Sequence, residues 1–301
     1  MRVIRAEQLT RAGGKENHAL EQHCTHTARC EIAGITMELC TDVADVARLF
    51  ALRYADHPAH KEPDFRYFVG TVRGGYAFWC AHAPAWRWTQ GVLPPDAIAF
   101  LADSVALAAI VRFDPALASM QAACVELGGI AAGLAGHSAA GKTATLLACA
   151  RRGMRIYSDE RTVLRNTIAH PYLRRNSVRA AGARLLLADQ ASDPKRDLLH
   201  SEPQLSIKTC FGADSIAEPA PLRALFVIGG SGYCAALEAI DTATAMPSVM
   251  RWFDAHGDMV DRATRAISIL NGVQCYKLTL GSPDESAAAM AYAMMRVAQR
   301  P

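Results

Sequence analysis

The sequence predicts an α/β protein with a mixed sheet and flanking helices, preceded by a smaller N-terminal α/β region. Three observations support this fold class. Segments with strand and helix periodicity alternate along the chain. A glycine-rich motif, Gly136–Thr143, stands between a predicted strand and a predicted helix. A further short strand ends in two adjacent carboxylates, Asp159 and Glu160.

The N-terminal part of the chain divides into two stretches. Residues 1–28 are polar, and we expect them to form a flexible N-terminal tail. Residues 29–118 have the pattern of a separate N-terminal α/β domain. The elements predicted there are a strand pair around Gly34, a helix over 42–54, a hairpin around Gly74-Gly75 and a helix over 97–110.

Residues 119–301 form the predicted second domain. It opens with two short strands around the turn Gly128-Gly129. The segment after the glycine-rich motif is rich in helix formers and ends in Arg152-Gly153, which is typical of a helix C-terminus. The later elements predicted are strands near 205–208, 222–228 and 273–280, and helices near 235–255, 258–270 and 284–299.

The glycine-rich motif fills every fixed position of the phosphate-binding loop G-x-x-x-x-G-K-[ST]. Its glycines let backbone N–H groups face phosphate oxygens. Lys142 places a charge near the β- and γ-phosphates, and the Thr143 hydroxyl can ligate Mg²⁺. The helix start behind the loop also favours an anion. We therefore predict nucleoside triphosphate binding by Gly136, His137, Ser138, Ala139, Ala140, Gly141, Lys142 and Thr143.

The acid pair follows the next predicted strand. In open α/β sheets, ligands bind at the carboxyl ends of the strands. Two carboxylates at such an end are suited to Mg²⁺ binding and to acting as a general base on an attacking hydroxyl. An acidic turn between two strands would give the same pattern. The loop upstream favours the functional interpretation of Asp159 and Glu160.

In its order of motifs, the chain resembles the HPr kinase/phosphorylase family of P-loop kinases. That family has a strand pair, a P-loop, a helix, Arg-Gly, a short strand and an Asp-Asp pair. Here Arg152-Gly153 and then Asp159-Glu160 follow the loop without a gap. The resemblance is clear over 119–165 and weaker over 220–300. It implies an HPr-kinase-like P-loop domain that uses ATP and Mg²⁺.

The resemblance also implies roles for individual residues. Lys142 matches the lysine that contacts the triphosphate, and Asp159 matches the catalytic carboxylate of the family. Thr143 and Glu160 match the positions of the Mg²⁺ ligands. The resemblance therefore places the catalytic groups at Asp159 and Lys142 and the metal ligands at Thr143 and Glu160.

Three positions depart from the family pattern. The second acid is Glu160 rather than aspartate, and Ala139 stands where the family usually has glycine. The histidine that precedes the loop in the family falls on Gln121, and glutamine cannot take up a proton. The later Arg-Gly segment, associated in the family with dephosphorylation, has no convincing copy. The resemblance thus implies a one-way kinase that handles its proton differently or more slowly.

The function predicted is an ATP- and Mg²⁺-dependent kinase that phosphorylates a serine-type hydroxyl on a peptide or small protein. In layout the chain also resembles lasso-peptide tailoring kinases, which act on ribosomally made peptides, so a lasso-peptide precursor is one candidate acceptor. Two alternatives stay open. One is a nucleotide-binding regulatory or partner protein with little catalysis, and the other is a small-molecule kinase.

Composition narrows the range of partners. The chain of 301 residues is 51% hydrophobic and 20% charged, which suits a globular protein with a buried core. A net charge of +3 makes no case for nucleic acid or a membrane surface. Nine cysteines without paired spacing fit a reducing cytoplasm, and no apolar run is long enough to span a membrane. We expect a cytoplasmic protein, and the family resemblance makes a homo-oligomer possible.

Overall fold

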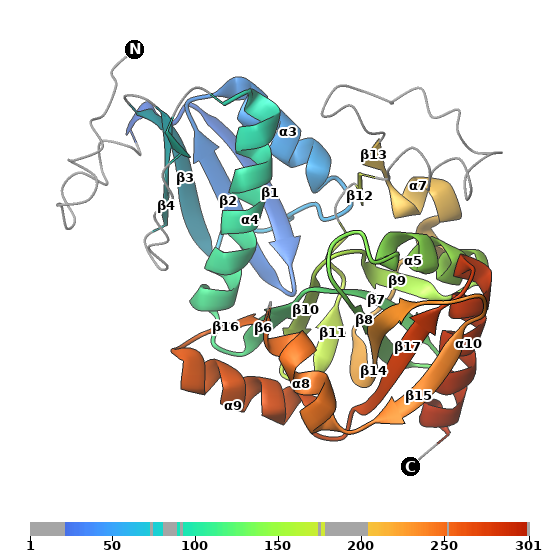
Figure 1. The fold of residues 1–301 in the computed structure, drawn as a ribbon. Coiled ribbons are helices and arrows are strands. Elements are labelled where there is room, and N and C mark those ends of the chain that lie inside the picture. The colour runs from blue at the N-terminus through green and yellow to red at the C-terminus, as the bar shows by residue number, and fades with distance from the viewer. Residues whose placement is uncertain are drawn as a thin grey trace. The chain divides into compact units, whose positions relative to one another are not determined.

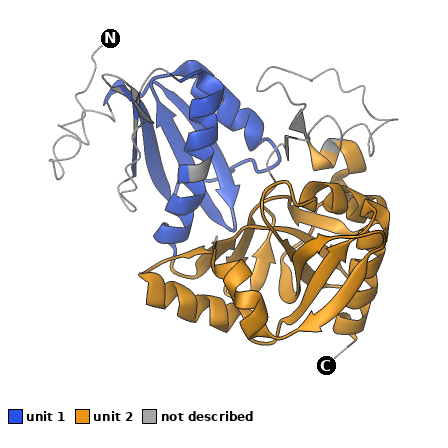
Figure 2. Ribbon diagram, viewed as in Figure 1, with its two compact units in different colours: residues 1–114 blue, residues 115–301 orange. Residues whose placement is uncertain are grey.

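The chain consists of two compact units, Met1–Asp114 and Pro115–Pro301 (Figure 2). The boundary expected from the sequence, after residue 118, falls just inside the second unit. The expected tail, 1–28, lies mostly outside the described residues, and its last three residues begin the first strand. The computed structural model describes residues 22–72, 75–80, 89–90, 93–173, 176–177, 204–251 and 253–299.

The first unit is built on a five-stranded sheet in the order β1-β2-β3-β4-β5 (Figure 1). Strands β2 and β3 are parallel and are connected through helix α3, while the other neighbours are antiparallel. Helices α3 and α4 pack against each other. The elements are β1 (His26–Ile32), β2 (Ile35–Thr41), α3 (Ala44–Arg53), β3 (Phe65–Val72), β4 (Gly75–Cys80), β5 (Thr89–Gln90) and α4 (Pro95–Phe113).

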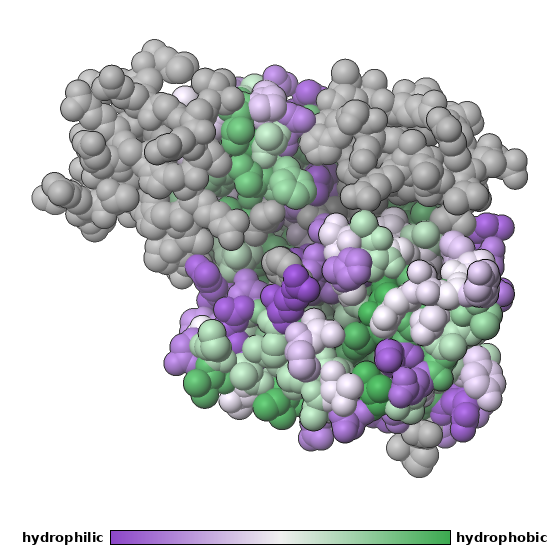
Figure 3. All heavy atoms as spheres, in the orientation of Figure 1, coloured by the Kyte–Doolittle hydropathy of each residue, from purple (hydrophilic) through white to green (hydrophobic). Residues whose placement is uncertain are grey.

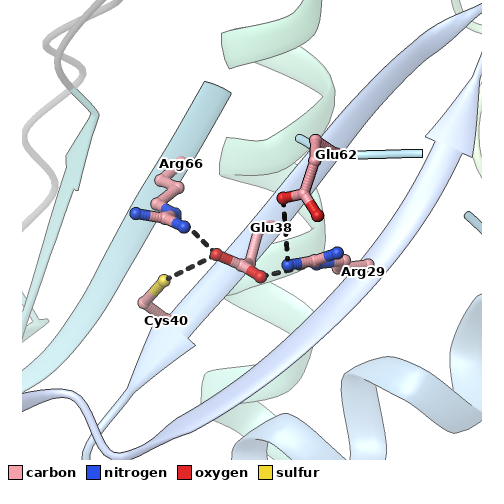
Figure 4. A network of polar contacts seen from close by, with 5 residues as sticks. All are labelled: Arg29, Glu38, Cys40, Glu62 and Arg66. Carbon is pink, nitrogen blue, oxygen red and sulfur yellow. Dashed lines mark hydrogen bonds and ion pairs between the residues drawn. The ribbon is translucent and has the colours of Figure 1, made fainter. Parts of the chain in front are cut away.

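A buried carboxylate ties three strands of this sheet together (Figure 4). The Glu38 side chain on β2 accepts hydrogen bonds at 2.6 Å from Arg29 on β1 and from Arg66 on β3. Burial alone would raise the pKa of Glu38, but the two guanidinium groups outweigh it and hold that pKa below its ordinary value. The exposed Glu62 pairs with the other side of Arg29 at 3.6 Å. This network fixes the register of the three strands.

The second unit is built on a ten-stranded mixed sheet, so the chain is a mixed α/β protein with a large sheet and flanking helices. The long strand β14 is its centre, because it runs parallel to β8 on one side and to β17 on the other. The strands are β6 (Leu117–Met120), β7 (Ala122–Leu127), β8 (Ile130–Ala135), β9 (Arg155–Ser158), β10 (Thr162–Arg165), β11 (Ile168–His170), β14 (Ala220–Ser231), β15 (Ala236–Ile240), β16 (Asp254–Ala255) and β17 (Gln274–Leu280).

Helices cover this sheet on both faces (Figure 1). Leu146 and Leu147 of α5 share one core with Met290 and Met294 of α10. Helices α8 and α9 contribute to a second core together with strands β6 and β10. The helices are α5 (Lys142–Arg151), α8 (Thr242–Met250), α9 (Met259–Leu270) and α10 (Pro283–Ala298), with α7 (Ile207–Phe211), η1 (Ala213–Ser215) and the strand pair β12 (Asn176–Ser177) and β13 (Gln204–Leu205) beside them.

Two expected elements differ from the structure. The helix expected over 235–255 is strand β15, helix α8 and strand β16 in succession. Residues Ala236–Ile240 contain helix formers, but pairing with β17 along their whole length overrides that local preference. Asp241 then caps α8 by accepting a hydrogen bond from the Thr244 N–H. Similarly, the strand expected near 205–208 ends at Leu205, and α7 begins at Ile207.

Helix α9 exposes three large apolar side chains, and Figure 3 shows hydrophobic patches over this helix. Met259, Val260 and Ile267 are 79%, 72% and 58% exposed. The two arginines of the helix point elsewhere, because Arg262 donates to the Phe253 carbonyl and Arg265 to the Ala116 carbonyl. The exposed side of α9 therefore carries these three apolar side chains beside the exposed Asp261. No helix in the described part of the chain is long and apolar enough to cross a membrane.

Candidate functional site

The glycine-rich loop connects the carboxyl end of β8 to the first residue of α5, as the sequence predicts. Gly141 is the N-cap of the helix and has a φ of 96°, in the left-handed region that favours glycine. A Cβ at this position would lie 3.0 Å from Cδ1 of Leu280, at the end of β17. Both the backbone conformation and the close neighbour therefore require glycine at 141.

The other end of the loop is equally confined. A Cβ at Gly136 would lie 3.0 Å from Cδ1 of Ile228 on the neighbouring parallel strand β14. Ala139, at the exposed crest of the loop, has a φ of 65°. This is the position at which the resembled family usually has glycine, and here an alanine adopts the backbone conformation that favours glycine. The loop therefore carries local strain at Ala139.

Lys142 lies inside the loop and is only 7% exposed. Its ammonium group donates to the Gly136 carbonyl at 2.7 Å and to the His137 carbonyl at 2.8 Å. Burial lowers the pKa of Lys142, and the negative charges of Glu160 and Asp159 act in the opposite direction. The acid pair thus lies close enough to act electrostatically on the loop lysine.

The start of α5 is open to an anion. No side chain of the described residues caps its first turn, so the N–H groups there face the loop without a side-chain partner. The first backbone hydrogen bond of the helix runs from the Thr145 N–H to the Gly141 carbonyl at 3.0 Å. His137, Ser138 and Ala139 are exposed at the crest of the loop. A helix N-terminus without a side-chain cap and a lysine beside it are the features that favour an anion.

Two pairs of strands hold the acid pair in place. Asp159 and Glu160 follow β9, which pairs with β7, and precede β10, which pairs with β6. The hydroxyl groups of Ser158 and Thr162, on either side of the pair, both donate to the Ala122 carbonyl, at 3.5 Å and 2.9 Å. Both carboxylate residues are partly buried. The sheet therefore brings together the loop and the acids that the sequence predicts as one site.

Gln121 lies between these two parts of the site. Its neighbour Ala122 pairs with Ala135, the last residue before the loop, and its other neighbour Met120 pairs with Thr162. The Gln121 Oε1 atom is buried and accepts no hydrogen bond from the described residues. The sequence marks this position only as a departure from a family pattern. Its place at the junction of loop and acid pair follows from the strand register.

The donor set fits a nucleoside triphosphate with its metal. The loop offers a buried cation and helix N–H groups for phosphate oxygens. Thr143 and Glu160 offer the oxygen ligands that Mg²⁺ prefers. The described residues contain no group of three or more His, Cys, Asp or Glu side chains that could hold a metal by themselves. Mg²⁺ usually takes only one or two carboxylates and completes its coordination shell with phosphate and water, so it does not need such a group. Thr143 and Glu160 remain predicted ligands.

Several residues that shape the site are not evident from the sequence. Ile228 and Leu280 confine the two loop glycines from strands far along the chain. Ser158 and Thr162 fasten the acid pair to Ala122. These residues are ordinary strand residues whose role depends on tertiary pairing, and no local motif marks them. The fixed glycines of the loop were the only signal that close neighbours existed.

Comparison of the sequence with known protein families finds no match, and comparison with curated proteins finds none. Among solved structures, the chain is similar to the Hpr(Ser) kinase/phosphatase from Coxiella burnetii, with 10% sequence identity and a TM-score of 0.30. The alignment covers 59% of this chain and 95% of that chain. At that TM-score the likeness carries no argument about fold or activity.

Proposed function

We propose that this protein is an ATP- and Mg²⁺-dependent kinase of the HPr-kinase-like type, which phosphorylates a serine-type hydroxyl. One observation carries the proposal above the others. The loop and the acid pair, which are separated in the sequence by the whole of α5, follow strands β8 and β9, and both strands pair with β7 in the folded protein. This arrangement supports the proposal, because phosphoryl transfer to a hydroxyl requires at least a triphosphate site with a base beside it.

Each residue has a role in this reaction. The loop N–H groups and Lys142 bind the triphosphate and offset the charge that develops during transfer. Asp159 accepts the proton of the acceptor hydroxyl. The oxygen of that hydroxyl bonds to the γ-phosphorus as the bond between the γ-phosphorus and ADP breaks. Thr143 and Glu160 would hold Mg²⁺, which supplies further charge neutralisation when bound. The partly buried position of Asp159 limits its access to bulk water.

The acceptor we propose is a peptide or small protein, with a lasso-peptide precursor as one candidate. The support is the sequence resemblance to tailoring kinases of ribosomally made peptides. We also propose that the protein works in the cytoplasm, because its nine cysteines show no paired spacing in the sequence. The homo-oligomer stays a prediction.

The test is a phosphoryl-transfer assay on the full chain. The protein is incubated with ATP, Mg²⁺ and a panel of serine-containing peptides, and added phosphate is detected by mass spectrometry. Asp159→Asn should reduce transfer by about 10²–10⁴-fold, as loss of a general base does. Glu160→Gln should raise the Mg²⁺ concentration needed for half-maximal rate. The matched control is Glu238→Gln on the exposed strand β15. It should change neither the rate of phosphoryl transfer nor the Mg²⁺ concentration needed for half-maximal rate.

The result also separates the two alternatives. A regulatory or partner protein would bind ATP in calorimetry but add no phosphate to any peptide, with Asp159→Asn without effect. A small-molecule kinase would transfer phosphate to a small hydroxyl compound but to no peptide. Absence of ATP binding would contradict the proposed function altogether.

A further inference from the structure

The turn between β14 and β15, residues 232–235, lies at the same edge of the sheet as the glycine-rich loop. Strands β14 and β17 run parallel to β8. Strand β9 has the same direction, because β7 pairs antiparallel with both β8 and β9. The carboxyl ends of these four strands therefore share one edge, and open α/β sheets bind their ligands at such an edge. The β14–β15 turn is thus part of the surface around the candidate site.

The β14–β15 turn is fastened to the end of β17, beside the loop. The Gly232 N–H donates to the Leu280 carbonyl at 2.7 Å. Three residues later, the chain passes so close to Gly281 that a Cβ there would lie 2.4 Å from the Ala235 nitrogen. Leu280 is also the residue whose Cδ1 atom confines Gly141. Because one residue of β17 adjoins both the turn and the start of α5, the turn and the loop are neighbours.

The β14–β15 turn presents a tyrosine to solvent. Tyr233 is 108% exposed, more than any other large hydrophobic residue in the described part of the chain. The residues before it include Gly229, Gly230 and Gly232, and glycine has no side chain that could cover the ring. A tyrosine offers a large flat surface at a low cost in conformational entropy, since few side-chain angles must be fixed. The ring is therefore accessible to a flat ligand at this edge.

The acid pair indicates which end of a bound nucleotide reaches the turn. In the sheet, β7 and β9 lie on one side of β8, whereas β14 and β17 lie on the other. The proposed role of Asp159 requires the γ-phosphate on the side of β9. The ribose and nucleobase extend from the opposite end of the triphosphate, towards β14 and β17. Two strand spacings put β17 roughly 10 Å from β8, a span that the α-phosphate and ribose can cover.

We propose that Tyr233 stacks on the nucleobase of the bound nucleotide and is the second anchor of the ATP site, after the glycine-rich loop. Stacking of a base on an aromatic ring adds affinity through the faces of the two rings and needs no hydrogen bond from the tyrosine hydroxyl. This inference rests on the proposed function for the position of the triphosphate. It adds a site for the nucleobase, about which the glycine-rich motif carries no information.

The test is calorimetry on the full chain with two ligands, ATP and inorganic tripolyphosphate, each with Mg²⁺. Tripolyphosphate has the three phosphates but no nucleobase. Tyr233→Ala should weaken ATP binding about tenfold and leave tripolyphosphate binding unchanged, whereas Tyr233→Phe should keep the wild-type affinity for both. The matched control is Tyr292→Ala on α10, a tyrosine that is 59% exposed, and it should bind both ligands as the wild type does.

The other outcomes would overturn the inference in distinct ways. An equal loss of affinity for ATP and tripolyphosphate in Tyr233→Ala would mean that the turn shapes the loop. A Tyr233→Phe variant as weak as Tyr233→Ala would mean that the hydroxyl, rather than the ring, binds. Unchanged ATP affinity in Tyr233→Ala with a raised KM for the peptide would assign the tyrosine to the acceptor. In these three cases the proposed kinase stands. If ATP does not bind the wild type, both proposals fail.

Discussion

At the scale of single residues, the loop shows how backbone conformation and sequence can disagree. Gly141 has a left-handed backbone and is glycine, as the geometry requires. Ala139 has a left-handed backbone but carries a Cβ. The left-handed conformation costs a residue with a Cβ about 1–2 kcal/mol. A loop that keeps such a residue at its exposed crest is strained at the position that would approach a phosphate.

We therefore expect Ala139→Gly to stabilise the protein by about 1 kcal/mol, measured by urea unfolding, and to bind ATP at least as tightly. The control is Ala33→Gly in the turn between β1 and β2, where the φ is 51°. It relieves the same kind of strain outside the site, so it should stabilise the first unit without any change in ATP affinity. Weaker ATP binding by Ala139→Gly would show that the strain contributes to phosphate recognition.

A second residue-scale prediction concerns pH. Burial lowers the pKa of His57 to about 4, although Asp56 acts to raise it. Below about pH 6.5 the unfolded chain binds a proton that the folded protein excludes, so stability falls as pH decreases from about 6.5 to about 4. His57→Gln should remove up to about 3 kcal/mol of this dependence.

The measurement is urea unfolding at a series of pH values, compared with the wild type. The exposed His60 provides the control variant, His60→Gln, which should follow the wild-type curve. Parallel curves for His57→Gln and the wild type over this pH range would contradict the prediction.

At the scale of elements, helix α5 carries the site at its first turn and ends in a second left-handed glycine. Gly141 precedes the helix with a φ of 96°, and Gly153 follows it with a φ of 82°. A Cβ at Gly141 would meet Leu280, whereas a Cβ at Gly153 would have nothing within 4 Å. The two ends of one helix thus offer a matched pair of substitutions.

Gly141→Ala should lower ATP affinity at least tenfold. The left-handed backbone alone costs an alanine about 1–2 kcal/mol, and the contact of the new Cβ with Leu280 should destabilise the protein further. Gly153→Ala should cost about 1–2 kcal/mol and leave ATP affinity unchanged, because it lies away from the phosphate site. Calorimetry with ATP and urea unfolding of both variants measure these effects. Equal loss of affinity in the two variants would show that helix stability, rather than loop shape, controls binding.

The elements also show which parts of the fold could be predicted from the sequence. The strand pair β7–β8, the loop and α5 were predictable, because turn glycines, a fixed motif and helix formers each act locally. Strand β15 was not, because Ala236–Ile240 contains helix formers and becomes a strand only through pairing with β17. The short strands β6, β10 and β11 were missed as well, since their pattern appears only in their pairing. The pairing of β6 with β10 is what brings the backbone at Gln121 to the strand that follows the acid pair.

At the scale of the whole molecule, the second unit contains the entire candidate site. Gln121, the loop and the acid pair all belong to Pro115–Pro301, and both faces of its sheet have their own core. A unit with its own core can fold alone. We expect a chain of residues 115–301 to fold and to bind ATP with the affinity of the full protein, as measured by circular dichroism and calorimetry.

The companion measurement is phosphorylation of a peptide identified with the full chain. Retained ATP binding with lost peptide phosphorylation would assign acceptor recognition to the first unit. Loss of ATP binding by a folded 115–301 chain would contradict the prediction, since the first unit would then contribute to the nucleotide site.

The bonds of Lys142 have a consequence for how strongly any phosphate can bind. Its ammonium group donates hydrogen bonds to the Gly136 and His137 carbonyls, at 2.7 Å and 2.8 Å, and so links the two residues at the start of the loop. A phosphate that recruits this cation competes with those carbonyls for it, and the measured affinity is the difference between two attractions. Replacing Lys142 by methionine would remove these two hydrogen bonds along with the charge. Faster amide hydrogen exchange over 136–141 in this variant without a ligand would show how much Lys142 contributes to the stability of the loop.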